Sequence, residues 1–202
     1  MRHVRTIAPQ GLRAGRAPQG GAAPRRSRED LLRQGLELLA EGGIDALTIE
    51  ALCARMGTTK GSFYHHFSGR DAFLRSLLEH WAEAAVPPPG RARGGRRRLD
   101  ALLPAPGGPE AAIRAWAMRD PEAGAYQCRV DARRQEHLET LLRETTGDPA
   151  RAALLARMGC AMLAGAEALA PPLGPAQRAA MLDVLWKELC ATPAARRGKE
   201  GS

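Results

Sequence analysis

The sequence has 202 residues, enough for one or two domains, and a formal net charge of +8. No apolar run approaches the roughly 20 residues that cross a bilayer, and residues 1–26 lack the apolar core of a secretory signal. The 4 cysteines lie far apart without a CxxC pair or a histidine at metal-binding spacing, so we expect buried thiols, no bound metal and a cytoplasmic protein without a membrane partner.

The positive charge lies mainly outside the first helical region. Residues 1–28 hold seven arginines and no acidic residue, and residues 87–98 hold five arginines, whereas residues 29–86 hold nine acidic and five basic residues. Residues 1–26 are rich in Gly, Pro, Ala and Arg without a periodic apolar pattern, which predicts a disordered arm. This arm either lies along DNA phosphates or in the minor groove, or is a dispensable solvated tail.

The first two predicted helices have clear start signals. Ser27 stands three residues before Asp30, as in a capping box, and leucines spaced three or four apart form the apolar stripe of the helix that follows. Paired glycines at 42–43 mark its end. Thr48 is a good N-cap for the second helix, and Gly57 stands where a helix C-cap favours positive φ.

A third short helix follows at once, after a tight turn that contains Thr58-Thr59. Phe63 and Phe67 are four residues apart and therefore share one side of this helix. Its other side is polar and holds a glycine that permits close approach: Lys60, Gly61, Ser62, Tyr64 and His65. The second and third helices are short and joined by a turn, and the third has one apolar side and one polar side. This arrangement predicts a helix-turn-helix unit that presses its second helix into the major groove of DNA.

The fourth predicted helix begins at residues 68–71 with the same kind of start as the first. Its apolar stripe runs to Trp81, and it stops near Val86 because the prolines at 87–89 forbid helical geometry.

Residues 31–81 resemble the DNA-binding domain of the tetracycline-repressor (TetR) family, most specifically in the Lys-Gly-x-hydrophobic-Tyr-x-His-Phe core at 60–67. An ordinary helical hairpin is the alternative. The acidic balance of residues 29–86 departs from what a phosphate-binding surface needs, which gives weight to the basic arm. The resemblance implies that residues of the second and third helices and the start of the fourth face DNA, with the first and last of this set on phosphates: Thr48, Thr59, Lys60, Gly61, Ser62, Tyr64, His65 and Arg70.

The pattern beyond residue 98 is again helical, with segments at 99–103, 109–119, 121–145, 149–170 and 175–192. Sustained period-two alternation is absent, so no strand is expected. We predict an all-α protein of about nine helices. It would consist of a disordered arm (1–26), a DNA-binding domain whose core is a three-helix helix-turn-helix (27–82), and a helical ligand-sensing and dimerisation domain (83–202).

The last two helices predict self-association. Small residues between Gly159 and Ala170 allow close backbone approach, and in the TetR family two such helices per subunit form a four-helix bundle about a two-fold axis. An intramolecular core is the alternative. Seven large or adaptable side chains predict a cavity for a small apolar or aromatic effector, although a residue of this kind is more often plain core than a ligand contact: Trp81, Trp116, Met118, Tyr126, His137, Met158 and Met162.

The sequence shows no activated nucleophile, metal cluster or phosphate-cradling loop, so we expect no catalytic residue and no cofactor. The favoured function is a homodimeric repressor on a near-palindromic site in double-stranded DNA, released by the effector. A constitutive DNA-binding protein without an accessible ligand site and an all-helical enzyme remain as alternatives.

Overall fold

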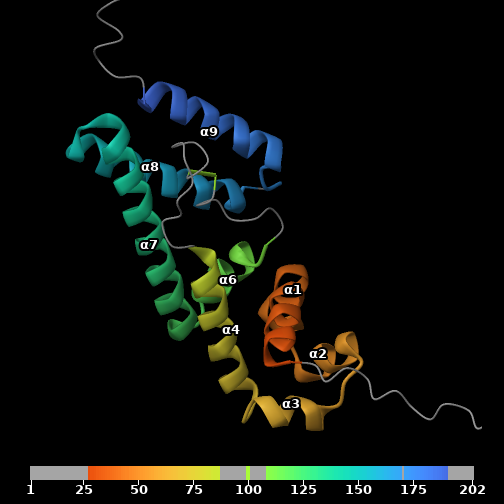
Figure 1. Ribbon diagram of the computed structural model, residues 1–202. Helices are drawn as coiled ribbons and strands as arrows, with labels where there is room; N and C mark the ends of the chain where they lie inside the picture. Colours follow the sequence, from red (N-terminus) through yellow and green to blue (C-terminus); the bar gives the residue numbers. More distant parts are fainter. Residues whose placement is uncertain (1–26, 87–98, 101–107, 170, 191–202) are drawn as a thin grey trace, which may run out of the picture.

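The computed structural model describes residues 27–86, 99–100, 108–169 and 171–190, and every regular element in these ranges is an α-helix (Figure 1). The predicted all-α class is confirmed, whereas the predicted arm at 1–26 and most of the predicted segment at 99–103 lie outside the described residues. The N-terminal helices are α1 (Arg28–Ala46), α2 (Ile49–Met56), α3 (Lys60–His66) and α4 (Arg70–Ala85). The C-terminal helices are α6 (Glu110–Ala117), α7 (Pro121–Thr146), α8 (Pro149–Ala168) and α9 (Pro175–Cys190).

The molecule is elongated, with α2 and α3 at one end and α8 and α9 at the other (Figure 1). Helices α4, α6 and α7 lie between these ends, and α4 packs on α7 while α1 packs on α6. No helix among the described residues is both long and apolar enough to span a membrane.

The capping signals read from the sequence form as expected at most helix starts. Ser27 Oγ accepts a bond from the Asp30 backbone N–H at 3.0 Å, and Asp30 Oδ2 accepts one from the Ser27 N–H at 3.0 Å, which completes the capping box. Thr48 accepts from the Ala51 N–H at 3.0 Å, and Thr59 accepts from the Ser62 N–H at 3.2 Å. These bonds fix the entry of the first three helices.

Two helix boundaries differ from the sequence prediction. Helix α1 does not end at the paired glycines: Gly43 adopts φ 71° and ψ −173°, and the helix resumes after this kink as far as Ala46. Helix α4 has Gly69 as its N-cap, without a side-chain capping bond. The predicted serine cap fails because Ser68 lies one position too early to reach the first free N–H groups.

A continuous apolar core joins the two halves of the molecule. In the N-terminal half, the ring of Phe73 lies 5.4 Å from that of Phe63 and 5.1 Å from that of Phe67, centroid to centroid. The same core cluster extends through Trp81 of α4 to Trp116 of α6. Helix α3 therefore rests on a packed base that reaches into the C-terminal half.

Candidate nucleic-acid interface and the polar cluster of the C-terminal half

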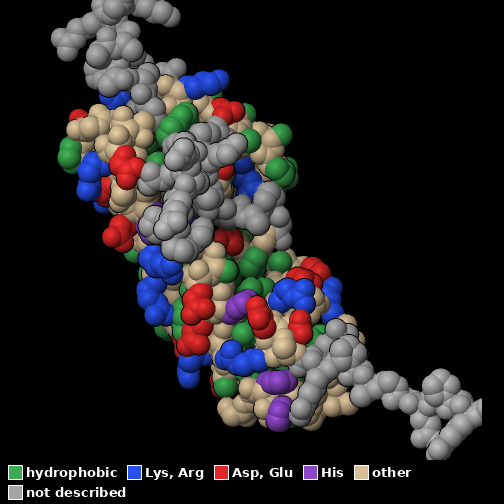
Figure 2. Space-filling model, in the orientation of Figure 1, with side chains coloured by type: hydrophobic (Ala, Val, Ile, Leu, Met, Phe, Trp, Pro, Cys, Tyr) green, Lys and Arg blue, Asp and Glu red, His purple; other side chains and the backbone are tan. Residues whose placement is uncertain are grey.

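Helix α3 presents a polar face that is held from behind by aromatic packing. Phe63 is fully buried, whereas Tyr64 is 54% exposed, and Lys60 and His65 are also exposed. Histidine side chains gather at the end of the molecule where α3 lies (Figure 2). The helix is short, so the buried Phe63 fixes which side of it faces outward.

Glycine at position 61 is not required by any neighbour within the chain. A Cβ built there would have the Thr59 Oγ1 atom, at 3.7 Å, as its nearest neighbour, which is ordinary van der Waals contact. Glycine costs helix stability relative to alanine. Its presence on the exposed face leaves room for a close approach from outside the chain.

Lys60 is not a free cation, because its Nζ forms an ion pair with the carboxylate of Glu50 on α2. The hydrogen bond from Lys60 lowers the pKa of Glu50, and the same bond raises the pKa of Lys60. Both side chains are more than half exposed. The sequence analysis did not single out Glu50, because a pattern of single residues does not show which side chains meet across a turn.

The other predicted contacts at this end are also partly engaged. The Arg70 guanidinium donates long bonds to the carbonyl oxygens of Ile44, at 3.5 Å, and Leu47, at 3.4 Å, and so lies against the end of α1. The Thr48 and Thr59 hydroxyl oxygens act as cap acceptors, which leaves each O–H as a possible donor to an outside acceptor.

The seven residues predicted to line a ligand cavity occupy very different environments. Trp81, Trp116 and Tyr126 belong to the buried core, and His137 and Met162 are half-buried. Met118 is 84% exposed and Met158 is 49% exposed. The predicted set therefore contains both core residues and surface residues.

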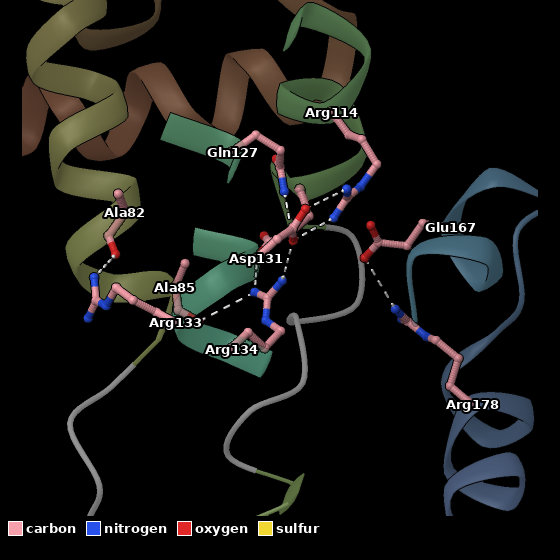
Figure 3. Close-up of polar contacts among 10 residues, drawn as sticks. Ala82, Ala85, Arg114, Gln127, Asp131, Arg133, Arg134, Glu167 and Arg178 are labelled. Atoms are coloured by element: carbon pink, nitrogen blue, oxygen red, sulfur yellow. Dashed lines mark hydrogen bonds and ion pairs between the residues drawn. The ribbon is translucent and has the colours of Figure 1, made fainter. Parts of the chain in front are cut away.

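The C-terminal half contains a polar cluster that the sequence analysis missed. Arg134 of α7 is buried and donates to Glu110 of α6 at 2.9 Å. Asp131, one turn earlier on α7, accepts bonds from Arg114 at 3.0 and 3.1 Å and from the Gln127 amide at 3.0 Å (Figure 3). Burial alone would raise the pKa of Asp131, but the bonds from Arg114 and Gln127 outweigh it and lower this pKa.

This cluster also holds the end of α4. Arg133 donates to the carbonyl oxygens of Ala82 at 3.1 Å and Val86 at 2.9 Å. Arg134 donates to the carbonyl oxygen of Ala85 at 3.4 Å, and Figure 3 shows the contacts with Ala82 and Ala85. The last carbonyls of a helix have no partner within it. Two arginines of α7 therefore supply the partners that α4 lacks and tie it to the C-terminal half.

Comparison with known proteins adds a family assignment for the N-terminal helices. Residues 31–77 match the family described as "Bacterial regulatory proteins, tetR family". An uncharacterized helix-turn-helix (HTH) type transcriptional regulator of Mycobacterium tuberculosis is 34% identical over 92 residues, which are 45% of this chain and 42% of that protein. The transcriptional regulator AcuR of Cereibacter sphaeroides is 35% identical over 71 residues, 35% of this chain and 32% of that protein.

A third relative is the HTH-type transcriptional repressor KstR2 of Mycolicibacterium smegmatis, 27% identical over 33% of each chain. The aligned region spans less than half the length of each of these relatives. A crystal structure of a transcriptional regulator from Rhodococcus sp. Rha1 has a similar fold, with a TM-score of 0.56 and 21% identity over 84% of this chain and 89% of that one.

Proposed function

Because this chain belongs to the tetR family of bacterial regulatory proteins through residues 31–77, we propose that it is a transcriptional repressor that inserts α3 into the major groove of double-stranded DNA. One observation carries the proposal. The exposed face of α3 is polar and contains a glycine that no neighbour requires, while buried Phe63 fixes the orientation of that face. The matched relatives are named as regulators, and one as a repressor, which supports a regulator over an enzyme.

We assign residues 27–82 to DNA binding and residues 83–202 to sensing and assembly. In this assignment Lys60 exchanges the carboxylate of Glu50 for an acceptor on a guanine edge. The exposed Tyr64 hydroxyl binds a phosphate, which positions the helix without selecting sequence. The remaining predicted contacts keep the same role as DNA-facing groups around this helix: Thr48, Thr59, Gly61, Ser62, His65 and Arg70.

The test is fluorescence anisotropy with duplex DNA from the region upstream of the chain's own gene. Lys60→Ala should weaken binding by about 5- to 150-fold and relax the preference at one guanine position, the cost of losing a base contact. Arg75→Ala is the matched control, because Arg75 is an exposed cation that pairs with Glu122 of α7 and lies outside the predicted DNA contacts and outside α8 and α9. Equal losses in the two variants would contradict the placement of α3.

We further propose that two copies bind together through α8 and α9 and read a near-palindromic site. Leu154, Met158 and Val184 are exposed on these helices, at 60%, 49% and 62%. A two-fold contact would cover them and present two α3 helices roughly 34–36 Å apart, one repeat of DNA.

Gly165 provides the test of this assembly. A Cβ there would meet nothing within 4 Å, so a side chain at position 165 begins in open space in the single chain. We expect Gly165→Leu to give monomers in analytical ultracentrifugation, a circular-dichroism spectrum as helical as that of the wild type, and much weaker binding to the full site. A dimeric Gly165→Leu variant would contradict this interface.

Release from DNA by a small effector is the last part of the proposal, and it rests on the attachment of α4 to α7. A constitutive DNA-binding protein is the second candidate. The burial of Trp81, Trp116 and Tyr126 in a continuous core favours it, because those residues then contribute packing and no cavity.

A further inference from the structure

A surface pocket lies between α6 and α8, beside the polar cluster. Its volume is about 240 Å³, below the roughly 300–1,000 Å³ of sites for drug-sized ligands. Two charged side chains stand in a wall that is otherwise made of small or flexible apolar groups: Ala111, Arg114, Ala115, Met118, Ala164, Glu167 and Ala168. The pocket therefore suits a small molecule with a short apolar body.

Among the described residues, the Glu167 carboxylate has no cationic partner at hydrogen-bond distance. Its side chain is only 12% exposed, and the ion pair that it makes with Arg178 of α9 has an N–O distance of 3.8 Å, too long for a hydrogen bond. Burial raises the pKa of Glu167, the charge of Glu110 raises it further, and Arg114 and Arg178 do not reverse the shift. The surroundings of Glu167 thus compensate a negative charge on its carboxylate only in part.

Arg114 does not supply the missing compensation, because its guanidinium is bound to another carboxylate. Two of its nitrogens donate to Asp131 at 3.0 and 3.1 Å, a paired geometry that is strong and specific. Figure 3 shows the Arg114–Asp131 pair and the Glu167–Arg178 pair as separate contacts from neighbouring helices. Arg114 Nε is buried and has no hydrogen-bond partner among the described residues. An N–H donor of this kind could bind an anion, so the alternative to a cationic ligand is an anionic one.

We propose that the pocket between α6 and α8 binds a small organic cation, a protonated amine with a short apolar body. The ammonium group lies on the Glu167 carboxylate, which gains the close partner that it lacks. The apolar body lies on the alanines and the exposed Met118 side chain, which adapts to its shape. An anion in the same place would meet the Glu167 carboxylate and would have to compete with Asp131 for Arg114.

The position of the pocket gives its ligand a route to α4. Arg114 contacts Asp131, and Asp131 lies 3.7 Å from Arg134, which donates to the Ala85 carbonyl at the end of α4 (Figure 3). A cation bound at Glu167 would change the charge beside Arg114, where this series of contacts begins. This step rests on the proposed function, whereas binding of the amine does not.

The experiment is isothermal titration calorimetry of the full chain with hexylamine, hexanol and hexanoate, which share one apolar body and differ in charge. Hexylamine should bind at least about tenfold more tightly than hexanol or hexanoate, which is a difference of about 1.4 kcal/mol in binding free energy. Glu167→Gln should remove the preference for the amine over the alcohol. Glu122→Gln is the matched control, because Glu122 is an exposed glutamate paired with Arg75 outside the pocket, and it should keep that preference.

Ala164→Met provides a second variant that fills the pocket without changing its charge, and it should abolish binding of all three compounds. Tightest binding of hexanoate, equal binding of the three compounds, or a preference for the amine that survives in Glu167→Gln would overturn the proposal. Anisotropy with operator DNA is a separate measurement. A wild-type chain that binds no operator contradicts the proposed function, while calorimetry still decides the amine site.

Discussion

The two halves of this molecule use charge in opposite ways. Around α1 to α4 the described core is apolar, and ion pairs such as Lys60–Glu50 are exposed. Among the described residues, the buried polar or charged ones are Glu110, Gln127 and Arg134, which belong to α6 and α7. A surface pair contributes about 0–1 kcal/mol, whereas a buried charge left without its partner costs several kcal/mol.

This difference indicates what each half is built to do. An apolar core with exposed charges holds a short helix rigidly and leaves its polar side chains able to change partners. A buried charged cluster contributes little net stability compared with apolar packing. Because the cluster holds the end of α4, we expect a change of charge within it to alter the position of that helix.

The largest effect that separates the halves is expected from Arg134→Ala. This change leaves Glu110 buried without its partner, and it should lower the free energy of unfolding by about 3–5 kcal/mol. Arg33→Ala removes the exposed pair with Asp30 and should cost no more than about 1 kcal/mol. Urea denaturation of both variants measures the contrast. The double change Arg134→Met with Glu110→Leu should restore most of the loss, and similar losses in the two single variants would remove the distinction.

A smaller effect with a defined pH dependence is expected from Asp131→Asn. The pKa of Asp131 is lowered in the folded protein, so its carboxylate stabilises the fold above the unfolded-state pKa, near 3.9 for an aspartate. That contribution is lost as the pH falls through the folded-state pKa. The variant should therefore be less stable than the wild type at neutral pH, and the two should converge in strong acid. If the difference in the free energy of unfolding between wild type and variant stayed constant from pH 7 to pH 2, the contact between Asp131 and Arg114 would not be electrostatic.

Removing the partner of Lys60 should act on DNA binding and not on stability. Glu50→Gln frees Lys60 from an exposed ion pair and should raise DNA affinity by about 2- to 5-fold, the range expected for a surface pair. Glu41→Gln is the matched control, because it removes the same charge from an exposed pair with Arg55 on α2. Anisotropy with one operator and with single-base variants compares them. If both variants change affinity equally without a change in base preference, only the overall charge matters.

The smallest effect should come from Gly61→Ala, and its sign should differ between the two measurements. The new methyl group has room within the chain, so the free energy of unfolding should rise by at most about 0.5–1 kcal/mol. DNA affinity should fall, because the methyl group occupies the space of the close approach. Gly69→Ala, at the start of α4, is the control for a glycine that also has open space around it. An affinity that rises together with stability would show that no molecule approaches position 61 closely.

The sequence by itself determined the local features of this protein. The capping residues Ser27, Thr48 and Thr59, and Gly57 in the left-handed conformation, act within one helical turn, so they could be read without a partner in space. Apolar periodicity then gave the helices, and the motif at 60–67 indicated the family that residues 31–77 match. The predicted contacts with DNA and with an effector remain predictions.

The tertiary structure alone decided which side chains meet. Glu50 reaches Lys60 across a turn, and Arg133 and Arg134 reach the end of α4 from 47 to 51 positions away in the sequence. Periodicity marks the apolar face of a helix but does not tell which neighbour covers it, and for this reason it did not separate the buried Trp116 from the exposed Met118. Caps and periodicity are properties of one segment, whereas pairing and burial depend on how several helices pack together.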